Sequence, residues 1–242
     1  MTLIYIIITS LLISFLSLVG LFTLSLKQAV LKKSLMLMVA LSAGSLMGGV
    51  FFHLLPEALA ELPQEQVFLA LLGSFILFFL VEKILHWRHC HHSHCEVHTF
   101  GYMNLLGDAV HNFIDGLVIA AAFMNSSNLG IVTSFAIAAH ELPQEIGDFG
   151  VLLHAGFSRR QALGFNFLTA LTALLGAISG YFLFTLAEDL IIYLLPFAAG
   201  GFLYIATVDL LPELRKELQV KKVVASLLTF MLGLAFMYLL KE

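Results

Sequence analysis

The stretch HELPQEIGD, residues 140 to 148, lies inside a segment that is otherwise apolar, with IVTSFAIAA before it and FGVLL after it. The surrounding residues suit a membrane helix, yet the stretch contains His140, Glu141, Glu145 and Asp148. A bare carboxylate deep in a bilayer is unfavourable by several kcal/mol unless it faces a cavity, a partner or an ion. The stretch therefore predicts a membrane-spanning helix with a functional polar face.

The composition of the whole chain also indicates a membrane protein. The chain has 242 residues, of which 60% are hydrophobic and 12% are charged, and its mean hydropathy of +0.97 is far above that of soluble domains. A helix of roughly 20 apolar residues crosses the hydrocarbon core. The pattern shows none of the alternation that a membrane β-barrel requires. We therefore predict an all-α polytopic membrane protein with eight transmembrane helices.

The eight spans are predicted from the apolar stretches that are long enough to cross a bilayer. They are residues 3–26, 35–55, 67–87, 100–123, 129–153, 162–186, 190–211 and 223–240. The connections between them are too short to hold a second domain, so residues 1–242 are expected to form a single transmembrane domain.

Lysine and arginine predict the orientation of the spans. All basic residues except Lys241 fall in connections on one side of the predicted bundle, and the positive-inside rule places that side in the cytoplasm. Both termini are therefore predicted to lie outside. The sequence shows no eukaryotic targeting extension or ectodomain, so a prokaryotic inner membrane is the expected location.

An internal repeat relates the two ends of the chain. AGSLMGGVFFHLLPE begins at Ala43 and AGGFLYIATVDLLPE begins at Ala199, an offset of 156 residues. The two segments lie in spans two and seven, which run in opposite directions, as in the inverted repeats of many transporters. We predict that spans one to three and six to eight are inverted repeats around spans four and five. Chance similarity among Leu-rich segments is the alternative.

The repeat aligns His53 of span two with Asp209 of span seven. Each is a candidate for lining a path to or from a central site. The alternative for each is a polar side chain that a neighbouring helix satisfies.

Span four contains the segment GDAVHNFIDGLVIA, which begins at Gly107. Its polar residues Asp108, His111, Asn112 and Asp115 recur at spacings of three and four, which places them on one helical face. Imidazole nitrogens and carboxylate oxygens together are ligands for a divalent cation, and a bound cation would offset the repulsion among crowded acids. Span four is therefore predicted to supply half of a metal site.

Span five would supply the other half. His140 and Gln144 lie four residues apart, with Glu141 and Glu145 on the adjoining rows of the helix. The stretch also resembles the His-Glu-x-x-His motif of zinc metalloproteases. However, Gln144 replaces the second histidine, and Pro143 disturbs the helical register that this motif needs. An intramembrane protease is therefore a minor alternative, and no enzymatic activity is expected.

HNFIDG at 111–116 followed by HELPQEIGDF at 140–149 resembles the fourth- and fifth-helix signatures of the ZIP family of divalent-metal transporters. Eight spans and external termini also match this family. The resemblance implies uptake of a divalent metal, first of all Zn²⁺ and alternatively Fe²⁺, Mn²⁺ or Cd²⁺, into the cytoplasm. It also implies a binuclear-type site between helices four and five. The implied ligands are His111, Asn112, Asp115, His140, Glu141 and Gln144.

Two positions depart from the family pattern. Many members have histidine where Gln144 stands, and an amide is a weaker zinc ligand, so affinity or selectivity is expected to differ. Helix six, which can supply a carboxylate in the family, offers only Asn166. Further along span five, Glu145 and Asp148 are candidates for later stepping ligands or proton acceptors.

The segment HWRHCHHSHCEVH, which lies within the predicted loop 86–99, contains six histidines and two cysteines. Its spacing matches no closed structural zinc site. A flexible cytoplasmic segment that collects or senses metal is predicted, and an ordinary solvated loop is the alternative.

The expected partners are a divalent metal ion and the lipid bilayer, and nothing in the sequence points to nucleic acid. The family resemblance is compatible with a homodimer. The main functional alternative is a proton-coupled metal exporter, because ligand residues do not reveal the direction of transport.

Overall fold

The computed structural model describes residues 2–21, 28–89 and 98–240, and every regular element in those ranges is helical. In chain order the elements are α1 (Thr2–Ser14), η1 (Phe15–Gly20), α3 (Gln28–Gly49), η2 (Val50–Leu54), α4 (Leu55–Glu61), α5 (Gln64–His89), α6 (Thr99–Asn125), α7 (Ser127–His154), α8 (Arg159–Ala170), α9 (Thr172–Phe182), α10 (Phe184–Tyr204), η3 (Ile205–Leu210), α11 (Leu211–Arg215) and α12 (Val220–Leu239).

Seven segments of the described residues are long and apolar enough to cross a membrane. They are Thr2–Gly20, Ser34–Glu61, Gln64–Ile84, Thr99–Asn125, Arg159–Phe182, Ile192–Arg215 and Val220–Leu239. The remaining predicted span is α7, whose 28 residues are also long enough to cross, but whose acidic and amide side chains lower its hydropathy. The prediction of an all-α polytopic membrane protein is confirmed.

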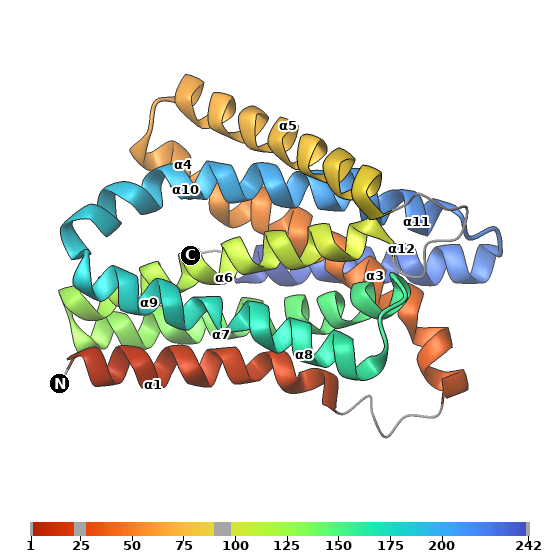
Figure 1. Cartoon of the computed structure of the whole chain (residues 1–242), viewed down its shortest axis with the longest axis horizontal. Helices are drawn as coiled ribbons and strands as arrows, with labels where there is room; N and C mark the ends of the chain where they lie inside the picture. The colour runs from red at the N-terminus through yellow and green to blue at the C-terminus, as the bar shows by residue number, and fades with distance from the viewer. Residues whose placement is uncertain (1, 22–27, 90–97, 241–242) are drawn as a thin grey trace.

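The long helices run side by side along the longest axis of the molecule, with α5 at one edge and α1 at the other (Figure 1). The central helix α6 contacts α7, α9 and α10. By contrast, only 17% of the most apolar stretch of α5, and likewise of α12, is buried within the protein. These two helices therefore form much of the outer surface, and α6 and α7 lie in the interior.

The inverted repeat is visible in the packing as well as in the sequence. α3 packs against α12 and α7, and its repeat mate α10 packs against α5 and α6. An ideal Cβ on Gly44 would lie 2.2 Å from the Phe230 carbonyl oxygen of α12, and one on the repeat mate Gly200 would lie 2.3 Å from the Leu71 carbonyl oxygen of α5. Such close backbone contacts are typical of small residues at membrane helix interfaces. The predicted repeat is confirmed.

The two repeats share a further feature, a single π-helical turn at equivalent positions. These turns are η2, which contains His53, and η3, which contains Asp209. Each is followed by proline, Pro56 at the start of α4 and Pro212 at the start of α11. Proline lacks the N–H that would continue the regular helical ladder, and a local π turn is one way to accommodate the change. Because π turns are frequent at functional sites, both positions are candidates for a functional role.

Glycines also fix the position of α6. An ideal Cβ on Gly116 of α6 would lie 1.9 Å from the Ala173 carbonyl oxygen of α9, and one on Gly176 of α9 would lie 1.9 Å from the Phe113 carbonyl oxygen of α6. Only residues without a Cβ allow the two backbones to approach so closely. This contact determines which face of α6 points toward α7.

Candidate metal centre

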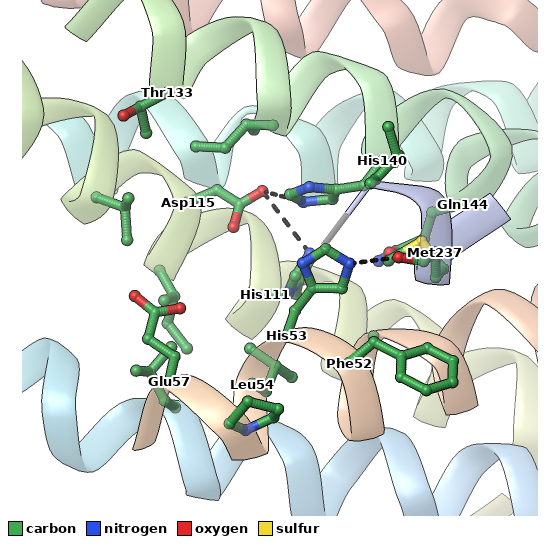
Figure 2. Close-up of a pocket in the computed structure, with 17 residues that line it drawn as sticks. Phe52, His53, Leu54, Glu57, His111, Asp115, Thr133, His140, Gln144 and Met237 are labelled. Carbon is green, nitrogen blue, oxygen red and sulfur yellow. Dashed lines mark hydrogen bonds and ion pairs between the residues drawn. The ribbon is translucent and has the colours of Figure 1, made fainter. Parts of the chain in front are cut away.

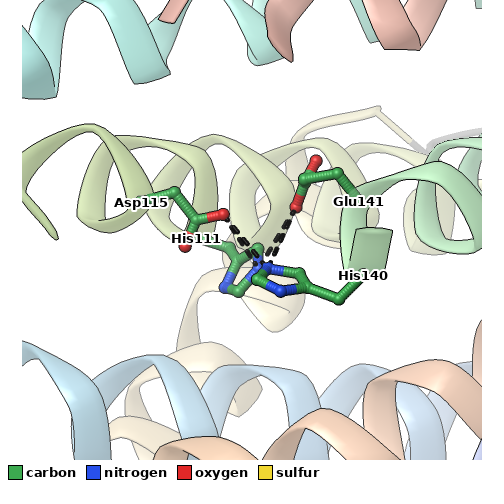
Figure 3. Close-up of side chains that lie close together, drawn as sticks. All are labelled: His111, Asp115, His140 and Glu141. Carbon is green, nitrogen blue, oxygen red and sulfur yellow. Dashed lines mark hydrogen bonds and ion pairs between the residues drawn. The ribbon is translucent and has the colours of Figure 1, made fainter. Parts of the chain in front are cut away.

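Four metal-ligating side chains meet between α6 and α7. His111 and Asp115 come from α6, and His140 and Glu141 come from α7, as Figure 3 shows. One ligand atom from each residue lies within 4.8 Å of the other three. The spacing of four residues on α6 places His111 above Asp115 on one helical face, so both point across to the neighbouring helix.

The distances within this cluster suit a small cation with four ligands. The His111 Nε2 atom lies 3.3 Å from Glu141 Oε1 and 3.7 Å from Asp115 Oδ2, and the His140 Nε2 atom lies 3.2 Å from Asp115 Oδ2 and 3.9 Å from Glu141 Oε1. Tetrahedral ligands about 2 Å from a zinc ion lie about 3.3 Å from one another. The four ligand atoms therefore need only small movements to surround a zinc-sized ion.

Several polar atoms of the cluster lack a hydrogen-bond partner. Both ring nitrogens of His111 and the Oε1 atom of Glu141 are buried and unpartnered. An unsatisfied buried polar atom destabilises the folded protein by about 1–3 kcal/mol, so native proteins rarely retain one without a reason. A cation held by these atoms would satisfy them.

Asn112 and Gln144, the other two residues of the predicted ligand set, lie beside the cluster and outside its four-atom core. The Nδ2 atom of Asn112 donates to Asp108 Oδ1 at 2.8 Å, which leaves its Oδ1 atom buried and unpartnered. Gln144 is also buried, its Nε2 atom is unpartnered, and it lines the same cavity as His111 and His140. The structure thus brings together four of the six predicted ligands and places the other two next to them.

A second group of carboxylates follows the cluster along the two helices. Asp108, Glu145 and Asp148 are each at most 2% exposed. Ser42 of α3 donates to Asp148 Oδ1 at 3.1 Å, and Asn166 of α8 donates to Glu145 Oε2 at 2.5 Å. Asn166, the polar residue noted in predicted span six, therefore contacts Glu145. Neutral donors on neighbouring helices therefore hold Glu145 and Asp148 in place.

A cavity of about 480 Å³ connects the cluster to one end of the bundle. Its lining includes His111, Asp115 and His140 at the cluster, and it extends to Glu57 and Leu240, near α4 and the end of α12 (Figures 1 and 2). This is the end that the basic residues predict to face outside. The four-residue ligand cluster therefore lies in a cavity that extends toward the predicted outer end of the bundle.

His53 lies beside the cluster in the wall of this cavity, as Figure 2 shows. Its ring is 6.0 Å from the ring of His140, and its Nε2 atom is 2.9 Å from the Met237 carbonyl oxygen. The sequence leaves two alternatives for His53, a residue lining a path or a polar side chain satisfied by a neighbouring helix, and the structure shows both features, because His53 lies in the cavity wall and contacts α12.

The opposite end of the bundle contains polar contacts that the sequence pattern does not predict. Tyr204 of α10 donates a hydrogen bond from its hydroxyl group to Glu82 of α5. The His154 Nε2 atom lies 3.1 Å from Glu213 Oε2, and Lys216 also pairs with Glu213. The one sequence signal for Glu213 is its alignment with Glu57 in the repeat.

The predicted His-rich loop 86–99 is only partly covered, because residues 90–97 lie outside the described part of the chain. Its last histidine, His98, donates its backbone N–H to the Ala155 carbonyl oxygen at 2.8 Å. The end of this loop is therefore attached beside His154, at the predicted inner end.

Comparison with known proteins identifies the family. A family model described as ZIP zinc transporter matches residues 1–99 and 88–241. The chain belongs to the ZIP zinc transporter family. Zinc transporter ZIP13 of Pongo abelii is 36% identical over 219 residues, which cover 84% of this chain and 65% of that protein. Human ZIP13 is 32% identical over 259 residues, which cover 84% of this chain and 69% of the human protein.

Other relatives align with a smaller share of this chain. Zinc transporter zipt-7.2 of Caenorhabditis elegans is 38% identical over 151 residues, covering 60% of this chain and 32% of that protein. The chain also spans less than two thirds of the length of mouse ZIP13, at 62%. These relatives are eukaryotic, so they give no support to the expected prokaryotic inner membrane. ZIP proteins are transporters, and the family match does not support the protease alternative.

Proposed function

We propose that this ZIP protein carries a divalent cation, with Zn²⁺ as its main substrate, from the outside into the cytoplasm. The cation would be bound by His111, Asp115, His140 and Glu141, and Asn112 and Gln144 would complete the ligand set. The observation that carries this proposal is the buried cluster of four ligands in a cavity.

The charge of the cluster supports a divalent substrate. Two carboxylates and two neutral imidazoles match the charge of one divalent cation, so the loaded site would have no net charge inside the bilayer. The energy of placing an unpaired ion in a low-dielectric interior is high. The same four groups would replace water molecules of the hydrated ion, because nitrogen and oxygen ligands at about 2 Å are those that zinc prefers.

The ligand types favour zinc and also permit related ions. Imidazole is a ligand for zinc and iron, and carboxylate also suits manganese, so Fe²⁺, Mn²⁺ and Cd²⁺ are the expected competitors. Gln144 beside the cluster offers an amide, which is a weaker zinc ligand than imidazole. Selectivity would therefore depend on Gln144 as well as on the four core residues.

In the proposed inward direction, the ion would meet the polar groups of α7 in chain order. The ion would come through the cavity to His140 and Glu141 and would then pass Glu145 and Asp148, which lie further toward the predicted cytoplasmic end. The His-rich segment 86–99 would receive the released ion. Both termini would face outside, in keeping with Figure 1, where the start of α1 and the end of α12 point to the same end of the bundle.

The direction is tested with purified protein in liposomes of known orientation. Uptake of radiolabelled zinc from the side of Glu57 supports the proposal. Zinc that leaves preloaded liposomes in exchange for protons, which enter down their gradient, supports the proton-coupled exporter. A homodimer in the bilayer stays a prediction, to be tested by the mass of the detergent-solubilised protein.

A further inference from the structure

The buried face of α8 contains a polar residue between two alanines. The buried residues of this helix are Ala162, Asn166 and Ala170, which recur every four positions and therefore lie on one face. The small alanines let α8 pack closely against α6 and α7. Asn166 is 0% exposed, and a fully buried amide is rarely found without a hydrogen-bond partner.

The partner of Asn166 is Glu145 of α7. The Asn166 Nδ2 atom lies 2.5 Å from the Glu145 Oε2 atom and 3.4 Å from the Glu145 carbonyl oxygen. A hydrogen bond to a carboxylate is stronger than one between neutral groups. One amide group therefore contacts both the side chain and the backbone of Glu145, which fixes the carboxylate relative to α7.

Glu145 needs such a fixed donor because acids surround it. Asp108, Glu141 and Asp148 all interact electrostatically with Glu145, and like charges in a buried site repel one another strongly. Glu141 lies four residues before Glu145, on the same face of α7. Repulsion would move the Glu145 carboxylate away from this face, and the bond from Asn166 opposes that movement.

We propose, on the basis of the transport function proposed above, that Asn166 is a positioning residue for zinc transfer along α7. It acts through Glu145, whose carboxylate it holds one helical turn beyond Glu141. A zinc ion that leaves Glu141 would then meet a carboxylate that is already in place. Groups that orient a metal ligand by a hydrogen bond affect metal handling although they do not touch the metal.

A double-mutant cycle tests whether Asn166 acts through Glu145. The variants are Asn166→Leu, Glu145→Gln and the two combined, compared in radiolabelled zinc uptake into liposomes and in equilibrium zinc binding in detergent. Asn166→Gln keeps an amide donor, and Asn166→Ala replaces Asn166→Leu in the cycle if the larger side chain prevents folding. The control is Ser14→Ala, which removes the bond from Ser14 Oγ to the Ala170 carbonyl oxygen, a buried contact of α8 that involves no acid.

We expect Asn166→Leu to bind zinc with wild-type affinity and to take it up roughly tenfold more slowly, the scale of losing one group that orients a metal ligand. Glu145→Gln should show a similar loss. The double variant should be no slower than the slower single variant, because no charged carboxylate is left to position, whereas independent effects would multiply to roughly a hundredfold. Asn166→Gln should be faster than Asn166→Leu, and Ser14→Ala should keep the wild-type rate.

Three results would overturn this role of Asn166 while leaving the proposed transport function intact. They are a wild-type rate in Asn166→Leu, multiplied losses in the double variant, and an equal loss in Asn166→Leu and Ser14→Ala, which would indicate a general effect on the packing of α8. A wild-type rate in Glu145→Gln would remove Glu145 from the path, and Asn166 with it. Absence of zinc uptake by the wild-type protein would instead overturn the transport function itself.

Discussion

The His111 Nε2 atom of α6 lies 3.3 Å from the Glu141 Oε1 atom of α7, and neither atom has a hydrogen-bond partner. This contact joins the two central helices through groups that bind metals. A cation between these groups would replace an unsatisfied contact with two coordinate bonds. Metal binding and the packing of α6 against α7 are therefore expected to be coupled.

Removing an imidazole from the cluster should abolish most zinc binding. For His111→Ala we expect a loss of affinity greater than the roughly 10–100-fold that follows loss of a supporting group around a metal. Equilibrium binding of radiolabelled zinc measures the change. Thr133→Val is the control, because Thr133 lines the cavity but is not part of the cluster; similar affinities for the two variants would argue against the cluster.

Introducing a histidine at position 144 should increase the preference for zinc over Mn²⁺. Gln144→His would place an imidazole next to His111 and His140 in the cavity, and imidazole prefers zinc more strongly than it prefers manganese. Competition of Mn²⁺ against zinc uptake measures this preference. The competition should weaken in Gln144→His and stay unchanged in Gln144→Asn; unchanged competition in both variants would exclude Gln144 from the ligand set.

The buried acids beyond the cluster should affect the rate of transport more than binding. Glu145→Gln and Asp148→Asn keep the side-chain size and leave the partners Asn166 and Ser42 in place. We expect uptake to slow on the order of tenfold, the scale of losing one group that supports a metal, with zinc affinity retained. Unchanged uptake in both variants would remove these residues from the path.

The contact between α6 and α9 should tolerate no side chain. A methyl group at Gly116 would meet the Ala173 carbonyl oxygen at 1.9 Å, so Gly116→Ala should destabilise the protein by about 1–3 kcal/mol through overpacking. Gly164→Ala is the control because nothing lies within 4 Å of a Cβ at that position. Thermal unfolding in detergent should show a lower midpoint for the first variant only; equal midpoints would contradict the close contact.

Much of the fold could be predicted from the sequence because membrane helices are long and apolar. The hydropathy pattern located the spans, and the three- and four-residue spacing in span four correctly placed His111 and Asp115 on one face. The 156-residue repeat predicted the inverted packing of the two halves. Ser14 and Ala170, which are also 156 residues apart, meet in that packing, where Ser14 Oγ donates a hydrogen bond to the Ala170 carbonyl oxygen.

Other features depend on contacts between helices that are distant in the sequence. The rotation of α6 about its axis is set by the glycine contact with α9, so the sequence alone did not indicate that the Nδ2 atom of Asn112 would donate to Asp108. The π turns at His53 and Asp209 are local changes in hydrogen bonding, which hydropathy does not record. The hydrogen bond between Tyr204 and Glu82 likewise joins two residues that are 122 positions apart in the sequence.

The most direct measurement of the central claim is uptake of radiolabelled zinc into liposomes that contain the purified protein. The wild type would be compared with a double variant, His140→Ala with Asp115→Ala, which removes one ligand from each central helix. The cluster predicts saturable uptake by the wild type and uptake at the level of empty liposomes for the folded double variant. Wild-type uptake by the double variant would show that zinc does not pass between α6 and α7.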